Sequence, residues 1–208
     1  MLVIPAINET DFAEVLKKIK LAEKFSEWIH LDVVDGEFSS NVTWKKSEEL
    51  KAVSSGLKAS LEAHLMVENP EAVIKEWVAA GVKRVIVHVE AANKEKLSKL
   101  KTGDFEIGLA INPDTPVEDV VPYLENYKFV LVLGVKPGLA GQKFDDSVLE
   151  KIKFLKTYFP NVIIEADGGI NLETAKLLKE AGADILVSAS YLWSSENPEE
   201  SYKNLAAI

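Results

Sequence analysis

The sequence predicts a closed (β/α)8 barrel, the TIM barrel of the α/β class, formed by residues 1–208 as one domain. Two observations predict it. Eight short apolar runs alternate with amphipathic segments from end to end, and no Pro/Gly/Ser-rich linker interrupts this order. Strict alternation of strands and helices implies a parallel sheet with right-handed crossovers. A chain of 208 residues can bury one such core.

The predicted strands are short runs rich in aliphatic and β-branched residues, each bounded by polar or turn-forming residues. They are Leu2–Ile7, Trp28–Val34, Leu61–Val67, Arg84–Glu90, Glu106–Asn112, Phe129–Val135, Val162–Asp167 and Ile185–Ala189.

The clearest helical segments between these strands show apolar residues at helical spacing. They are Asp11–Phe25, Pro70–Ala80, Asp145–Tyr158 and Leu172–Ala181. Capping or first-turn residues open several helices, at Asn69-Pro70-Glu71, Asp114-Thr115-Pro116 and Asn171-Leu172-Glu173. Gly81 and Gly182 each follow a helical segment and precede a strand, which is typical of a helix stop.

An open, doubly wound sheet is the alternative architecture. It would place a Gly-x-Gly-x-x-Gly turn after the first strand, and Ala6–Thr10 does not have that pattern. The closed barrel is therefore favoured.

Composition excludes several classes of function. A net charge of −9 without a basic stripe argues against nucleic acid as a partner, although backbone amides can still hold a small phosphate. The chain has no cysteine, so disulfides, thiolate metal sites and a cysteine nucleophile are excluded. No apolar stretch approaches membrane-spanning length. We expect a cytoplasmic protein with no membrane partner, and a homo-oligomer is compatible with the sequence.

Four polar residues at strand ends form the main candidate site. His30 and Asp32 are two residues apart in one predicted strand, so their side chains share a face. His64 and Asp167 lie near the ends of other strands, and in a barrel those ends meet. We expect these four residues to bind one divalent ion: zinc, iron(II), manganese or cobalt. The alternative is that each histidine is a core residue hydrogen-bonded to a carboxylate.

Two further polar residues are interpreted as supports. His88 has Glu90 on the same strand face, and Glu165 shares a face with Asp167 one layer deeper. Asp35-Gly36 is interpreted as the turn that leaves the second strand.

Small residues and glycines follow the last three strands, where barrels of this kind often bind phosphate. Glycines also punctuate ordinary turns, so each loop alone is a weak signal. The candidate phosphate-binding and substrate-binding residues of these loops are Gly138, Leu139, Ala140, Gly141, Gly168, Gly169, Ala189 and Ser190.

The chain resembles the ribulose-phosphate 3-epimerase family over nearly its whole length. The matching stretches are His30–Gly36, Ala63–Pro70, Val87–Ala91, Gly108–Pro113, Val135–Phe144 and Glu165–Ile170. The resemblance implies that His30, Asp32, His64 and Asp167 bind the metal and that the two aspartates also move the proton. It further implies substrate contacts at His64 and Met66.

This sequence departs from the family pattern around the expected substrate. A family serine after the first-strand proline is Ala6 here, and the Leu-Ser that follows is Asn8-Glu9. Glu37 and Ala140 replace a histidine and a glycine of two family loops, and Val34 and Leu133 stand where two family methionines pack over the substrate. These changes concern the identity of the sugar more than the reaction.

The resemblance implies an isomerase of the pentose phosphate pathway that interconverts D-ribulose 5-phosphate and D-xylulose 5-phosphate. Two carboxylates on opposite faces of an enediolate would exchange the proton at C3. Two alternatives stay open: an epimerase for a six-carbon ketose phosphate such as allulose 6-phosphate, and a sugar-phosphate-binding barrel without catalysis. Related decarboxylases and synthases carry Asp-x-Lys-x-x-Asp, and Asp32-Val33-Val34-Asp35 has no lysine.

Overall fold

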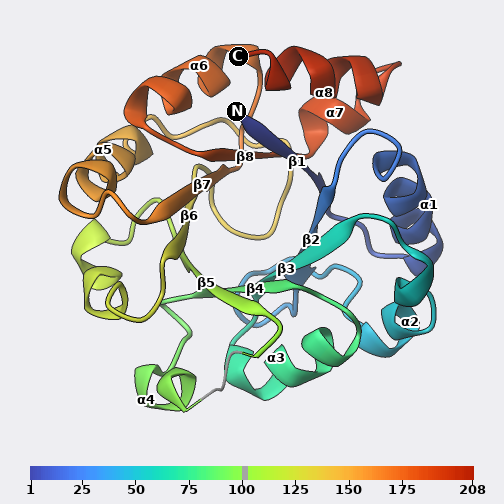
Figure 1. Ribbon diagram of the computed structural model, residues 1–208, viewed down its shortest axis with the longest axis horizontal. Coiled ribbons are helices and arrows are strands. Elements are labelled where there is room, and N and C mark those ends of the chain that lie inside the picture. Colours follow the sequence, from blue (N-terminus) through green and yellow to red (C-terminus); the bar gives the residue numbers. More distant parts are fainter. Residues whose placement is uncertain (100–102) are drawn as a thin grey trace.

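Eight parallel strands close into a barrel in the computed structural model, which describes residues 1–99 and 103–208 (Figure 1). The strands follow chain order around the barrel, and β1 pairs with both β2 and β8. Their bounds are β1 Leu2–Ile7, β2 Trp28–Val34, β3 Ser60–Met66, β4 Arg84–His88, β5 Glu106–Ile111, β6 Phe129–Leu133, β7 Ile163–Asp167 and β8 Ile185–Ser188. The predicted fold class is confirmed.

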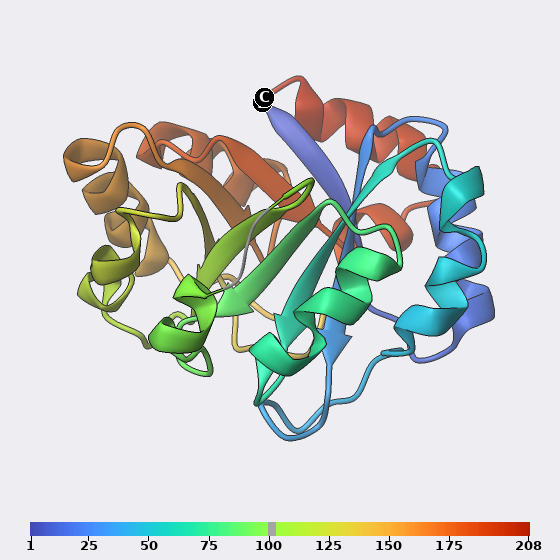
Figure 2. The ribbon, with the colours of Figure 1, turned by 60° about the horizontal axis from the view of Figure 1, so that its bottom comes forward.

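The helices lie outside the strands and cover the barrel wall (Figures 1 and 2). They are α1 Phe12–Ala22, α2 Ser47–Lys51, α3 Pro70–Ala79, α4 Lys94–Ser98, α5 Val148–Tyr158, α6 Leu172–Ala181, α7 Ser190–Trp193 and α8 Pro198–Ala206. In the described chain between β5 and β6, two 3-10 turns, Val117–Asp119 and Val121–Tyr123, take the place of an α-helix. The predicted helix start at Asp114–Pro116 therefore precedes a 3-10 helix instead of an α-helix.

Local hydrogen bonds explain where most helices begin and end. The Asn171 side chain caps α6 in a reciprocal pair with Thr174, and Gly182 ends that helix at a φ of 106°. Asn69 makes no capping hydrogen bond with its side chain, and Pro70 starts α3 instead. The predicted helix start at Asp145 is wrong because its carboxylate accepts the backbone N–H of Ser147 in a local turn.

Several predicted strands extend one or two residues beyond the observed ones. The predicted strand to Glu90 ends at His88, because the backbone N–H groups of Ala91 and Ala92 turn back to the His88 carbonyl. The run to Val135 likewise leaves the sheet after Leu133. Apolar residues continue into these loops, so periodicity alone does not mark the last sheet residue.

The barrel interior has an apolar part and a polar part. The inward residues of β1, β6 and β8 are apolar, and Phe129 is fully buried among them. The buried charged residues and histidines come from β2, β3, β7 and both ends of β4: His30, Asp32, Glu62, His64, Arg84, His88, Glu165 and Asp167. Buried polar groups are costly unless they are paired, so this part of the interior needs a specific explanation.

None of the helices in the described ranges is long and apolar enough to cross a membrane.

Candidate active site

A pocket opens at the carboxyl ends of the strands, as expected for this fold. Its lining is Asn8, Asp32, Met66, Leu133, Val135, Lys136, Pro137, Gly138, Leu139, Ala140, Gly141, Asp167, Gly168, Gly169, Ile170, Val187, Ala189 and Ser190. The loop after β6 forms much of one wall. Ser39 and Asn41 hold this loop through hydrogen bonds to the carbonyls of Pro137 and Gly138, at 2.8 and 2.7 Å.

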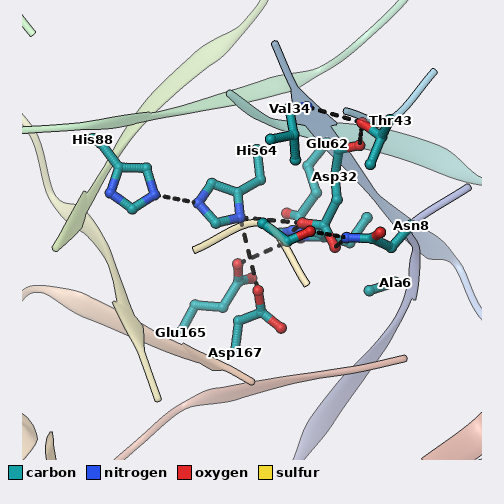
Figure 3. A network of polar contacts seen from close by, with 12 residues as sticks. Ala6, Asn8, Asp32, Val34, Thr43, Glu62, His64, His88, Glu165 and Asp167 are labelled. Carbon is teal, nitrogen blue, oxygen red and sulfur yellow. Dashed lines mark hydrogen bonds and ion pairs between the residues drawn. The ribbon is translucent and has the colours of Figure 1, made fainter. Parts of the chain in front are cut away.

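Two histidines and two aspartates converge at and just beneath the floor of this pocket: His30, Asp32, His64 and Asp167. Figure 3 labels the last three of them. His30 Nε2 and His64 Nδ1 each lie 3.3 Å from Asp32 Oδ1, and His64 Nδ1 lies 3.7 Å from Asp167 Oδ2. One ligand atom from each of the four residues lies within 4.8 Å of the others. Such a group of buried nitrogen and oxygen donors could hold a metal ion.

The donor atoms that face each other in this group lack other partners. His30 Nε2, Asp32 Oδ1 and His64 Nδ1 are buried and make no hydrogen bond within the described residues. Three such atoms around one point are costly unless something else satisfies them. A divalent cation would satisfy all three, so the residues fit a metal.

The second nitrogen of each imidazole is held by a neighbouring group. His30 Nδ1 lies 2.7 Å from Glu62 Oε1, and His64 Nε2 lies 2.8 Å from His88 Nε2. His88 Nδ1 lies 3.1 Å from Glu90 Oε2, which completes a chain from His64 to a carboxylate. These contacts orient both rings so that the other nitrogen faces the pocket floor.

The pKa values of the two aspartates are displaced in opposite directions. Burial and the nearby Asp32 carboxylate raise the pKa of Asp167 to about 7. Burial also acts to raise the pKa of Asp32, but the facing rings of His30 and His64 outweigh it and lower that pKa below its ordinary value. One carboxyl group is thus suited to carry a proton while the other accepts one.

Polar neighbours fix the position of Asp32. Asn8 Nδ2 donates to Asp32 Oδ2 over 3.1 Å. Thr43 Oγ1 donates to the Asp32 carbonyl over 2.7 Å and accepts the Val34 N–H over 2.9 Å. Hydrogen bonds therefore hold both the backbone at the end of β2 and the side chain of Asp32.

The structure brings together most of the residues that the sequence singled out. Met66 and all eight predicted loop residues, from Gly138 to Ser190, line the pocket with both aspartates. His30 and His64 are fully buried beneath it and do not line it. Glu165 is also fully buried, and neither of its oxygens has a hydrogen-bond partner in the described part of the chain.

Only some of the positions that depart from the family pattern lie at the pocket. Asn8, Leu133 and Ala140 line the pocket. The others do not line it: Ala6, Glu9, Val34 and Glu37.

Sequence reasoning missed three residues of this network, namely Thr43, Glu62 and Arg84. Glu62 is fully buried and accepts a hydrogen bond from Arg84 Nη1 at 2.6 Å. A signal was present for two of them, since each is a charged residue in an otherwise apolar strand.

The fold and pocket define a (β/α)8 protein with two aspartates in a metal-capable cluster at the carboxyl ends of its strands. The ribulose-phosphate 3 epimerase family model matches residues 2–193, and the chain belongs to this family. It is 35% identical over 206 residues to a ribulose-phosphate 3-epimerase of Chlamydia trachomatis serovar D, covering 95% of this chain and 88% of that protein. It is 35% identical over 211 residues to the ribulose-phosphate 3-epimerase of Bacillus subtilis, covering 98% and 97%.

Solved structures with low sequence identity share the fold. A 3-hexulose-6-phosphate synthase superposes with a TM-score of 0.75 at 15% identity, covering 100% of this chain and 99% of that one. Orotidine 5'-phosphate decarboxylase from Pyrococcus horikoshii OT3 gives a TM-score of 0.70 at 16% identity, with 98% and 97% covered. At this identity the likeness concerns the barrel alone.

Proposed function

We propose that this protein interconverts D-ribulose 5-phosphate and D-xylulose 5-phosphate by moving the proton at C3. The observation that carries the proposal is the pair Asp32 and Asp167, which face one pocket from β2 and β7 and have oppositely displaced pKa values. Family membership points to the same reaction. The pentose phosphate pathway and a cytoplasmic location are part of this proposal.

The two aspartates act in sequence. The ionised carboxylate of Asp32 takes the C3 proton from one face of the sugar, which leaves an enediolate. The protonated Asp167 delivers its proton to C3 from the opposite face, so the configuration inverts. In the reverse direction the two residues exchange roles.

Four residues would hold one divalent cation: His30, Asp32, His64 and Asp167. Zinc, iron(II), manganese and cobalt all suit imidazole and carboxylate ligands, and the bound ion would stabilise the negative charge that develops on the enediolate oxygens. Asn8 and Thr43 keep Asp32 in place throughout, through the contacts described above.

The phosphate would lie at the far wall of the pocket. Backbone N–H groups of Gly168, Gly169, Ala189 and Ser190 can approach an anion closely there. A Cβ at Gly169 would come within 2.9 Å of the Phe144 backbone, so a side chain does not fit at this point. Met66 and Leu133 would cover the sugar carbons, and the Gly138–Gly141 loop would close over them.

Deuterium incorporation at C3 tests the function directly. The protein is incubated in deuterated water with ribulose 5-phosphate or with allulose 6-phosphate, and proton NMR follows the C3 signal. With ribulose 5-phosphate, we expect fast loss of the C3 proton signal and formation of xylulose 5-phosphate. Faster exchange of the hexulose would favour the six-carbon alternative, for which the relevant observation is that Leu133 lines the pocket where the family pattern has the longer methionine. Binding without exchange of either sugar would favour the non-catalytic alternative.

A further inference from the structure

Arg84 is the only arginine among the 24 lysine and arginine residues, and it lies inside the barrel. It is the first residue of β4 and only 8% exposed. Its guanidinium carbon lies 3.8 Å from the ring centroid of Phe129 and 4.5 Å from that of Trp28. Burying a cation is costly unless the cation is paired, so the partners of Arg84 indicate its role.

Arg84 belongs to a row of polar residues that crosses four strands. In the sheet register His30 is opposite Glu62, Glu62 is opposite Arg84, and Arg84 is opposite Glu106. Arg84 Nη1 donates to Glu62 Oε2 over 2.6 Å, and Arg84 Nε donates to Glu106 Oε2 over 2.7 Å. The planar guanidinium can make both bonds at once, which a lysine ammonium on a flexible chain does less well.

Glu62 links Arg84 to the candidate metal site through hydrogen bonds. Its side chain is fully buried, with Oε2 on Arg84 and Oε1 at 2.7 Å from His30 Nδ1. This contact at Nδ1 fixes the rotation of the His30 ring. The other ring nitrogen, Nε2, then faces Asp32 Oδ1 at 3.3 Å.

A second carboxylate competes for the same imidazole. Glu165 Oε1 lies 3.7 Å from His30 Nδ1, and it has no hydrogen-bond partner among the described residues. Arg84 donates to Glu62, so Glu62 is the carboxylate held at hydrogen-bonding distance from His30.

We propose that Arg84 is a positioning residue for metal binding: it holds the Glu62 carboxylate against His30 Nδ1 and thereby orients the ring so that Nε2 faces a divalent cation. This inference rests on the metal role proposed above for His30. Loss of such a supporting contact typically weakens metal binding by about 10- to 100-fold.

The test combines nitrogen NMR of the histidines with zinc calorimetry on the full chain. The protein has three histidines, so the ¹⁵N spectrum is simple. In the zinc-bound wild type we expect His30 to bind through Nε2 and to keep a proton on Nδ1. Arg84→Met should weaken zinc binding by about 10- to 100-fold, and Arg84→Lys should restore part of the affinity. Lys83→Met removes an exposed charge from the preceding residue and should change neither readout.

Three results would overturn the proposal. The first is a zinc-bound wild type in which His30 keeps its proton on Nε2, which needs no variant to observe. The second is a folded Arg84→Met protein with wild-type zinc affinity. Should Arg84→Met fail to fold, Glu62→Gln replaces it, and unchanged zinc affinity there is the third. A wild type that binds no zinc, but whose His30 nitrogen shifts change in Arg84→Met, would refute the metal role proposed above and retain the positioning role.

Discussion

Asn8 donates a hydrogen bond from its side-chain nitrogen to Asp32 Oδ2 over 3.1 Å, so the two oxygens of Asp32 have different partners. Oδ1 faces the rings of His30 and His64, and Oδ2 is held from the side of the pocket. The proton transferred by Asp32 is therefore expected to pass through Oδ2, at an angle that Asn8 controls.

Replacing Asn8 by leucine, the residue at this place in the family pattern, should lower kcat. Loss of one hydrogen bond to a charged group corresponds to about 1.5–3 kcal/mol, or about 10- to 100-fold. The effect should fall on kcat more than on KM, measured by steady-state kinetics. Asn8 also lies 3.4 Å from the Gly138 carbonyl, so Asn41→Ala is the control, because Asn41 bonds that carbonyl without touching Asp32. An equal loss of kcat in both variants would mean that the effect comes from the loop at Gly138 and not from the bond to Asp32.

His64 and His88 should differ in their effect on metal binding. His64→Ala removes a donor atom of the candidate site, and the dissociation constant for zinc should rise by more than about 100-fold. His88→Ala removes only the group that orients the His64 ring, at 2.8 Å, and should cost about 10- to 100-fold. Isothermal calorimetry measures both values. A larger loss for His88→Ala than for His64→Ala would contradict the ligand assignment.

Asp35 should stabilise the fold in a pH-dependent way. Burial acts to raise its pKa, but hydrogen bonds from the backbone N–H groups of Glu68, Phe38 and Glu37 lower it below the ordinary value. A carboxyl group whose folded pKa is lowered stabilises the protein above its unfolded pKa of about 4, and this contribution is lost as the pH falls through the folded pKa.

Asp35→Ala should therefore lower the free energy of unfolding by about 1–3 kcal/mol at pH 7, with a smaller difference below about pH 4. Urea denaturation at both pH values measures it. Asp114→Ala, at an exposed residue after β5, is the control for a lost carboxylate. A difference from wild type that grows as the pH falls would contradict a lowered pKa for Asp35 in the folded protein.

A negative charge at Ser190 should interfere with phosphate binding. Ser190 begins α7 and lines the pocket beside Gly141. Ser190→Asp should raise KM for ribulose 5-phosphate about tenfold or more through like-charge repulsion, with kcat less affected. Ser190→Ala, which adds no charge, should change KM much less. Unchanged KM in Ser190→Asp would place the phosphate elsewhere.

The fold could be predicted from the sequence because each strand and most helices carry a local signal. Period-two spacing placed His30 and Asp32 on one face, and the structure has them there. The ends of the strands are harder to predict. Apolar residues continue past His88 into the loop, and β4 ends there because backbone N–H groups of the loop turn back to the His88 carbonyl. The segment between β5 and β6 has a cap signal at Asp114–Pro116 and folds into 3-10 turns.

The supporting network could not be predicted in the same way. Whether Glu62 reaches His30 depends on register between strands, which a single strand's pattern does not reveal. Asn8 stands out in the sequence only as a departure from the family pattern, and its bond to Asp32 depends on a contact across 24 residues. Arg84 is the only arginine in the chain and is a charged residue at the start of an apolar strand, but its pairing with Glu62 again depends on the register between strands.

The central claim is that Asp32 and Asp167 act on opposite faces of the same carbon. The measurement is deuterium exchange at C3 of each epimer, separately, by Asp167→Asn and Asp32→Asn, with Asp114→Asn as the control for a lost carboxylate. Each variant should lose epimerisation by about 10²–10⁴-fold or more. Asp167→Asn should retain slow exchange with one epimer only, and Asp32→Asn with the other. Near-normal turnover in either variant, or residual exchange with the same epimer in both, would contradict the two-carboxylate account.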